Sequence, residues 1–425
     1  MSGGATARRA VEAIWRLEAA RIIGGVARLV RDVGLAEEFA QDALVAALEH
    51  WPAGGVPDNP GAWLMTAAKR RALDHLRHQQ LAAGKAPEVA AELDFQHAMA
   101  SEAAAAQVDA ALDDTVGDDL LRLMFTACHP LLSPEARCAL TLRVMGGLTT
   151  DEIARACLLP EPTVAQRIVR AKRALAAARV PFEVPRGAEL VRRLDSVLEV
   201  IYLIFNEGYA ATAGEDWMRP GLCEEALRLG RVLAGLMPEA GEVLGLVALM
   251  EIQASRLQAR VTAGGEPVLL LDQDRRRWDR GLIARGLAAL GRAEALPGPL
   301  GPYALQAAIA ACHARAPTKE ATDWPRIAAL YDALAAAAPS PVVALNRAVA
   351  VAMAFGPEAG LEIVDGLLAE PRLQHYHLLP AVRGDLLARL DRMDEAREEF
   401  GRAATLSRNS RERALLLARA AACGC

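Results

Sequence analysis

Apolar residues recur every three or four positions through the first 80 residues, which predicts three or four helices with one buried side each. The first spans residues 11–29 and ends at the polar break Asp32 to Gly34. The second spans residues 35–52. After a loop at 52–60 with two glycines and three prolines, Asp58 or Asn59 can cap a third helix at 62–78. In the first helix we expect most of these residues in a core: Ile14, Trp15, Leu17, Ile22, Ile23 and Val26.

A second group of helices is predicted at residues 120–128, 134–145 and 147–175. Thr149 and Glu152 have the spacing of a capping box at the start of a short helix. Residues 158–160, Leu-Leu-Pro, interrupt that helix, and Pro162 suits the first turn of a second helix that begins at about Thr163. Two helices joined by so short a turn are typical of a helix-turn-helix.

The second helix of this pair is cationic on one side. Its inward positions are predicted to be Val164, Ile168, Val169 and Leu175, and its outward positions Gln166, Arg167, Arg170, Lys172 and Arg173. Residues 161–179 contain five Lys or Arg residues and one acidic residue, whereas the whole chain has a formal charge of -5. This local reversal of sign favours a polyanion such as DNA. An ordinary solvated helix face is the alternative.

The sign of the net charge changes from one segment to the next along the rest of the first 120 residues. The second helix has a mostly acidic side that we expect in water, formed by Glu37, Glu38, Gln41, Asp42 and Glu49. This side suits either a cationic protein partner or solvent. The third helix is a second basic segment, with Lys69, Arg70, Arg71, His75, Arg77 and His78 around Asp74. Residues 79–119 hold nine acids and one lysine, and we expect a tether that is partly helical at 95–112. Two cationic helices predict a bipartite grip on nucleic acid.

The C-terminal half repeats a helical pattern. Single helices are predicted at 190–209, 220–236, 241–257 and 274–290. Helix pairs follow, with first helices near Pro302, Pro341 and Leu378 and second helices near Asp323, Pro357 and Asp394. The second helices lie about 34 and then 37 residues apart, close to the tetratricopeptide period, and 411–423 would be a capping helix.

Composition agrees with an all-α fold. Aromatic residues are 4% of a chain that is 53% hydrophobic, whereas strands draw on aromatic and β-branched residues. No signal peptide and no apolar run of about 18 residues is present, so we expect a cytoplasmic protein. Nothing resembles a catalytic set, a cofactor site or a metal site. The terminal Cys423 and Cys425 form only one ligand pair, and Cys128-His129 and His375-Tyr-His377 are discounted in the same way.

The order of these segments resembles a bacterial extracytoplasmic-function (ECF) sigma factor. The resemblance covers residues 10–179 and implies region 2 at 10–80, an acidic linker at 81–118 and region 4 at 119–180, followed by a helical extension at 187–425. It implies that region 2 docks on core RNA polymerase through Glu38, Gln41, Asp42 and Trp51. It also implies that the minus-ten promoter element is read and melted by Trp63, Arg70, Arg71, Asp74, His75 and Arg77.

Region 4 would then read the minus-thirty-five element through Thr163, Gln166, Arg167, Arg170, Lys172 and Arg173. The implied partners are promoter DNA and the β′ clamp and β flap of the polymerase, with no membrane and no cofactor. The melting helix carries one aromatic residue, Trp63, and flipped bases are held by aromatic platforms, so we expect weak melting and demanding promoter selection.

Residues 203–212 and 270–279 resemble recurring segments of an ECF subgroup with a long C-terminal extension. Their polar residues are a candidate regulatory site or a docking site for a regulatory protein: Asn206, Glu207, Tyr209, Asp272, Asp274 and Arg275. The alternative is that they pair internally and fix helix ends. For the whole chain, the alternatives are a stand-alone helix-turn-helix regulator with a sensing domain and a helical scaffold protein.

Overall fold

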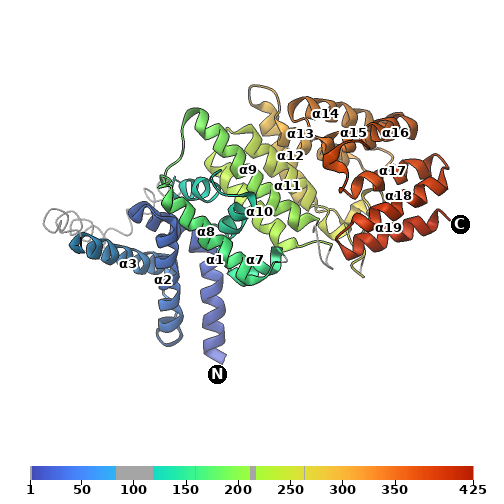
Figure 1. Cartoon of the computed structure of the whole chain (residues 1–425). Coiled ribbons are helices and arrows are strands. Elements are labelled where there is room, and N and C mark those ends of the chain that lie inside the picture. Colours follow the sequence, from blue (N-terminus) through green and yellow to red (C-terminus); the bar gives the residue numbers. More distant parts are fainter. Residues whose placement is uncertain (1, 83–117, 158, 211–216, 263, 425) are drawn as a thin grey trace. The chain divides into compact units, whose positions relative to one another are not determined.

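The computed structural model describes residues 2–82, 118–157, 159–210, 217–262 and 264–424 (Figure 1). It divides into two compact units, Met1–Ile201 and Tyr202–Cys425, and the boundary falls inside one helix, α9 (Gly187–Tyr209). The predicted helix at 95–112 and most of the acidic tether lie outside the described residues, as does Cys425.

The first 82 residues form an N-terminal module of three helices, α1 (Ser2–Val30), α2 (Val33–Gly54) and α3 (Pro60–Ala82). The side chain of Asp32 caps α2 by accepting from the Leu35 amide at 3.0 Å, and that of Asn59 caps α3 by accepting from the Ala62 amide at 3.0 Å. The buried side chains face one another: Trp15, Ile22, Ile23, Phe39, Ala43, Trp51, Leu64 and Ala68.

Two predictions for this module were wrong. Leu17 is 78% exposed, because it lies about 200° around the helix from Trp15, on the side away from the core. The second helix does not end at Pro52 but continues to Gly54, and the Gly55 amide donates to the carbonyl of Trp51. The buried Trp51 side chain anchors this last turn.

The second helical group consists of a helix at 118–127, α6 (Pro134–Val144), α7 (Thr150–Cys157) and α8 (Glu161–Ala177), and is called here the helix-turn-helix module. The capping box is confirmed: the Thr149 amide donates to Glu152 Oε2 at 2.9 Å and the Glu152 amide donates to Thr149 Oγ1 at 3.1 Å. Helix α8 begins two residues before Thr163, with Pro162 in its first turn.

The second unit continues with α10 (Pro220–Leu236), α11 (Gly241–Ala254) and α12 (Arg280–Ala295), the last two joined through three short 3-10 turns. The fourth single helix therefore begins at Arg280 rather than at 274, since Asp279 caps it by accepting from the Leu282 amide at 2.9 Å. Residues 275–277 form one of the 3-10 turns, η4.

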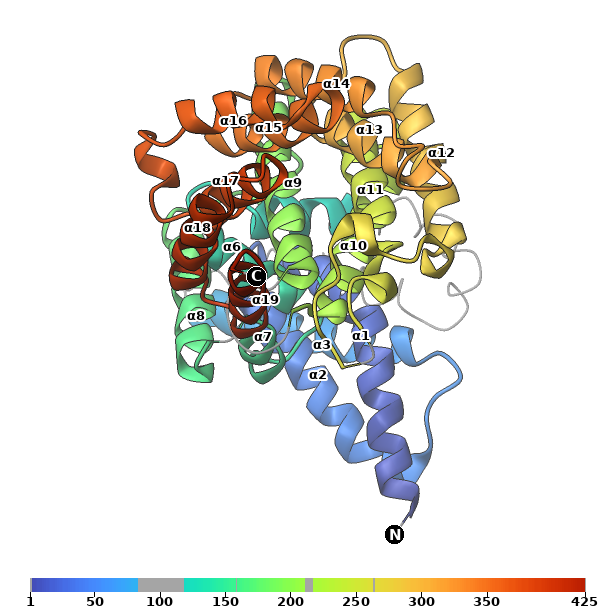
Figure 2. The same cartoon turned by 90° about the vertical axis from the view of Figure 1, so that its right-hand side faces the viewer.

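The predicted helix pairs are confirmed. They are α13 (Pro302–Arg315), α14 (Trp324–Ala337), α15 (Pro341–Phe355), α16 (Pro357–Gly366), α17 (Leu378–Arg389) and α18 (Met393–Leu406), with α19 (Ser410–Ala422) at the end. Each helix from α13 to α19 packs on the next, as Figure 2 shows. The described residues contain no strand, only an isolated bridge between Val261 and Pro267, so the fold is all-α. Within the same residues, no helix is both long and apolar enough to cross a bilayer.

Candidate nucleic-acid interface

The cationic side of α8 faces away from its module. Val164, Ile168 and Leu175 are buried, and the remainder of the buried stripe is Ala171 rather than Val169, which is 43% exposed. Val169 lies about 100° around the helix from Ile168 and so leaves the core. The outward side presents Gln166, Arg170 and Arg173 as exposed residues, with Thr163 and Arg167 half-buried. In the described part of the chain, Arg170 and Arg173 form no ion pair, so they are positioned to bind phosphates.

Lys172 is the exception on this helix. Its Nζ forms an ion pair with the carboxylate of Glu37 in α2, and its aliphatic stem lies against Gly34. Burial lowers the pKa of Lys172, and the nearby Asp32 carboxylate partly offsets that effect. This predicted DNA contact is therefore occupied by a carboxylate of the N-terminal module.

Glu37 itself was predicted to stay in water, and that prediction was wrong. The residue is only 4% exposed, because α8 packs on this side of α2 and the Arg143 side chain of α6 reaches it. Arg143 of α6 donates from Nε to Glu37 Oε1 at 2.7 Å and from Nη1 to the Leu148 carbonyl at 3.1 Å. No local pattern in the sequence distinguishes Glu37 from the exposed Glu38, since the covering helices lie more than 100 residues away.

The basic helix α3 is partly neutralised by its own neighbours. Arg71 pairs with Asp42 of α2 at 3.2 Å, and Arg77 pairs with Asp74 at 3.6 Å. Arg70 is exposed and has no ion pair within the described ranges. The ring of His75 lies 5.3 Å from that of Phe39, centroid to centroid. Arg70 is thus the most available cation among the predicted DNA contacts of α3.

Two tryptophans connect α2 with the start of α3. Trp63 is half-buried, and its ring meets that of Trp51 edge-on with centroids 5.5 Å apart. Trp51 is 3% exposed and lies inside the module, where it supports Trp63 instead of facing a partner. Of the four predicted polymerase contacts, Glu38, Gln41 and Asp42 remain at the surface of α2.

In the second unit, the two polar segments meet around an arginine that the sequence did not single out. Arg256 donates to the Tyr209 hydroxyl at 2.7 Å and lies 5.7 Å from the centroid of the Trp278 ring. Arg260 donates to the Tyr209 carbonyl at 3.0 Å and stacks 3.6 Å from the centroid of its ring. Tyr209 and the segment around Trp278 are therefore joined through the buried Arg256.

The remaining polar residues of these segments mostly make internal contacts. Arg275 donates to the carbonyls of His313 and Ala316 at 2.6 and 2.7 Å, so it satisfies the C-terminal end of α13. Glu207 pairs with Arg219. Asp274 caps η4 by accepting from the Arg276 amide at 3.0 Å, Asn206 bonds to Tyr202, and Asp272 is exposed. These contacts favour the alternative in which the segments fix helix ends.

Comparison with protein families gives three matches. The family described as Sigma-70 region 2 matches residues 15–81, and the family described as Sigma-70, region 4 matches residues 122–175. A family of unknown function, DUF6596, matches residues 193–294. The two regions thus correspond to the N-terminal module and the helix-turn-helix module.

Comparison with curated proteins gives one relative that matches nearly the whole chain and others that match less than half of it. An uncharacterized protein of Rhizobium meliloti is 43% identical over 395 residues, which is 93% of this chain and 91% of the relative. The ECF RNA polymerase sigma factor SigK of Mycobacterium ulcerans is 33% identical over 163 residues, 36% of this chain and 78% of the relative. The probable ECF RNA polymerase sigma factor SigI of Mycobacterium tuberculosis is 29% identical over 202 residues, 45% of this chain and 67% of the relative. No solved structure matches.

Proposed function

We propose how promoter recognition is divided within this chain, which belongs to the ECF family of RNA polymerase sigma factors. As a sigma factor it binds core RNA polymerase and promoter DNA and directs promoter-specific transcription. Such proteins are not a class of enzymes, and the polymerase performs the bond chemistry. We also propose that the protein acts in the cytoplasm together with the polymerase.

The helix-turn-helix module reads the minus-thirty-five element with the outward side of α8. The exposed Arg170 and Arg173 supply phosphate contacts, and Gln166 has the amide chemistry to read a base edge in the major groove. The buried stripe of α8 supports this assignment, because it fixes which side of the helix can enter the groove.

The N-terminal module reads and melts the minus-ten element with α3 and docks on the polymerase with α2. Arg70 is an exposed cation of α3 that has no ion pair within the described residues, and the half-buried Trp63 offers one aromatic edge to an unstacked base. The docking surface is Glu38, Gln41 and Asp42, directed at the β′ clamp, while region 4 contacts the β flap. One aromatic platform supports the expectation of weak melting.

The C-terminal extension modulates activity through α9. The first half of this helix belongs to the same unit as both promoter-binding modules. Arg193 donates to the Phe125 carbonyl at 2.7 Å, and Ser196 donates to the Cys128 carbonyl at 2.6 Å. Arg137 of α6 pairs with Glu199 at 2.9 Å. Changes in the extension can therefore reach the helix-turn-helix module along one continuous helix.

The observation that carries this proposal is that each of two separate helical modules presents an arginine side of one helix to solvent. The direct test mixes the full-length protein with core polymerase and a promoter library and sequences the transcripts. Specific start sites are expected. A stand-alone regulator would bind DNA alone and give no start site, and the match of residues 15–81 to Sigma-70 region 2 does not favour it.

Salt dependence tests the assigned side of α8. If about four phosphates are neutralised, tripling the salt lowers the affinity of the holoenzyme for its promoter about fiftyfold. Arg170→Ala should lower the log–log slope by about 0.9, as expected for one lost phosphate contact. The matched control is Arg192→Ala on α9, whose side chain is 75% exposed. A slope that Arg170→Ala leaves unchanged would remove Arg170 from the interface.

A further inference from the structure

We propose that Glu37 forms an ionic latch with Lys172 and Arg143 that holds the two promoter-binding modules together in the free protein and must open before promoter binding. The latch joins α2 to α8 and α6, and it rests on the proposed division of promoter reading between the modules. Glu37 is not one of the proposed promoter contacts, and the latch gives this buried carboxylate a regulatory role.

The contacts of the latch are charge-assisted and largely sheltered from water. The Glu37 side chain is 5% exposed, and the side chains of Arg143 and Lys172 are 18% and 22% exposed. Each Glu37 oxygen has a cation of its own, since Arg143 bonds to Oε1 and Lys172 pairs with Oε2. Removing one partner of such a group leaves a buried charge without compensation, so the closed arrangement depends on all three residues.

Small residues let the backbones of the two modules approach around the latch. A Cβ atom placed on Gly34 would lie 3.5 Å from Lys172 Cβ, and one placed on Gly147 would lie 3.2 Å from Ala19 Cβ. Gly147 has a φ of +64°, a conformation that disfavours side chains. One placed on Gly24 would lie 3.1 Å from the Asp119 carbonyl oxygen. The contact surface is therefore specific in shape, and not a chance encounter of two charges.

Two further ion pairs cross the same contact surface, and both are more exposed. Arg16 of α1 pairs with Glu152 of α7, and Arg28 of α1 lies 3.6 Å from Asp119. The Asp119 carboxylate is buried and also pairs with Arg122 of its own helix at 2.8 Å. Among the described carboxylates of this surface, Glu37 is the one whose two cations both belong to the other module.

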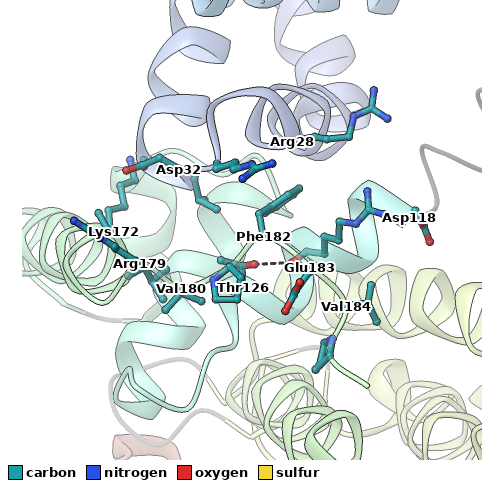
Figure 3. A pocket seen from close by; sticks show the side chains of 18 of the residues that line it. Arg28, Asp32, Asp118, Thr126, Lys172, Arg179, Val180, Phe182, Glu183 and Val184 are labelled. Atoms are coloured by element: carbon teal, nitrogen blue, oxygen red, sulfur yellow. Dashed lines mark hydrogen bonds and ion pairs between the residues drawn. The ribbon is translucent and has the colours of Figure 1, made fainter. Parts of the chain in front are cut away.

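A large hollow lies beside the latch, on the side of Lys172. The cavity has a volume of about 1490 Å³ and is lined by Lys172, Asp32, Arg28, Arg179 and residues 180–187, as Figure 3 shows. Its walls combine charged side chains with apolar ones such as Leu175 and Phe182. Lys172 thus lies at the edge of an open space and not within a continuous apolar core.

The closed arrangement is too short for the two promoter elements. Elements centred at minus-ten and minus-thirty-five lie about 25 base pairs apart, which is roughly 85 Å along straight duplex. Arg71 of α3 pairs with Asp42 at 3.2 Å, and Asp42 lies little more than one helical turn along α2 from Glu37. The reading helices α3 and α8 therefore lie on the order of 20 Å apart beside the latch. Since α8 touches α2 through the latch, both elements cannot be engaged until Glu37 and Lys172 part.

The Glu37 carboxylate and a DNA phosphate compete for the ammonium group of Lys172. The same ammonium group that pairs with the Glu37 carboxylate is a predicted phosphate contact, and it cannot serve both partners at once. The Glu37 carboxylate therefore occupies the position of a DNA phosphate in the closed protein. Binding to DNA exchanges one anion for another at Lys172, which keeps the cost of opening small.

A reversible disulfide tests the latch in the full-length protein. In the double variant Gly34→Cys with Lys172→Cys, the two Cβ atoms would lie 3.5 Å apart, within the range of disulfides. Oxidation of the free protein should close the modules, and holoenzyme made from it should give at least tenfold less specific transcript than the same protein after reduction. Each single variant should respond to oxidation no more than the wild-type chain, which retains the native cysteines.

The outcomes separate the latch from the function on which it rests. If the disulfide forms and the oxidised variant transcribes as well as the reduced one, the latch is overturned. If the wild-type chain gives no specific transcript with core polymerase, the sigma-factor assignment fails first.

A second variant keeps the test independent of cysteine chemistry. Glu37→Gln should open the latch and raise transcript yield severalfold at limiting protein, with an increased distance between spectroscopic probes placed on α3 and α8. Its matched control is Glu49→Gln on the exposed side of α2, which should change neither quantity. An unchanged distance in a folded Glu37→Gln protein would overturn the proposal.

Discussion

Glu37 and Glu251 are both buried carboxylates with two cationic partners, but they join different kinds of structure. Glu37 lies on α2 and pairs with residues of another module, Arg143 and Lys172. Glu251 lies on α11, is 1% exposed and pairs with Arg231 of α10 and Arg285 of α12, its neighbours in the chain. The first connects modules that must separate, and the second connects helices that remain packed.

The packing around each carboxylate explains this difference. Around Glu251, α11 packs on α12 so closely that a Cβ atom on Gly286 would lie 2.6 Å from Ile252 Cγ1. Apolar clusters continue through α12 and α13. Around Glu37, the contact between the modules is made by small residues such as Gly34, beside a hollow lined by charged and apolar side chains. A buried ion pair therefore stabilises the fold in one unit and controls an equilibrium between two arrangements in the other.

The largest expected effect concerns the carboxylate in the C-terminal unit. The double variant Arg231→Met with Arg285→Met leaves Glu251 buried without a cation, and the free energy of unfolding should fall by about 3–5 kcal/mol. Urea denaturation followed by circular dichroism measures this change. Adding Glu251→Met to the double variant removes the stranded charge and should restore most of the loss. Equal free energies of unfolding for the double variant and the wild type would show that the two ion pairs of Glu251 do not stabilise the fold.

The second effect is a pH dependence confined to the C-terminal unit. Burial, with the charges of Arg256 and Arg275, lowers the pKa of His313 to about 4. The unfolded chain takes up this proton near pH 6.5 and the folded chain does not, so stability falls as pH drops from about 6.5 to about 4. The expected loss is about 2–3 kcal/mol.

Denaturation at several pH values measures the loss, and His313→Phe supplies the comparison. Phenylalanine keeps a ring against Trp324, whose centroid lies 5.2 Å from that of His313, and has no proton to gain. The pH dependence between 6.5 and 4 should flatten in this variant. An identical slope in both proteins would assign the effect to other groups.

The smallest effect lies within the helix-turn-helix module, at Thr149, next to the Leu148 carbonyl that accepts from Arg143. Thr149→Ala removes the hydroxyl that caps α7 and should lower the free energy of unfolding of the unit Met1–Ile201 by about 1 kcal/mol. Thr149→Ser keeps the hydroxyl and should cost much less. Chemical denaturation compares the two variants, while transcript yield should not rise in either. A rise would mean that loosening the module is enough to open the protein, without Glu37.

Much of the fold follows from local patterns. The periodic apolar positions and the prolines at 302, 341 and 357 locate the starts of helices within a residue or two, because a helix start depends on nearby residues. The capping box at Thr149 and Glu152 is local for the same reason. The errors concern sides of helices: Leu17 and Val169 are apolar residues that the packing leaves in water.

The sequence by itself determined that this chain is all-α, where most of its helices begin, and that two of them carry arginines to solvent, because helical periodicity and local charge do not depend on distant residues. Only the tertiary structure decided that Glu37 is buried, that Trp51 is a core residue, and that Lys172 faces a carboxylate. Burial of a charged side chain depends on which distant helix covers it. The state of the promoter-reading surface is therefore decided by contacts between segments more than 100 residues apart.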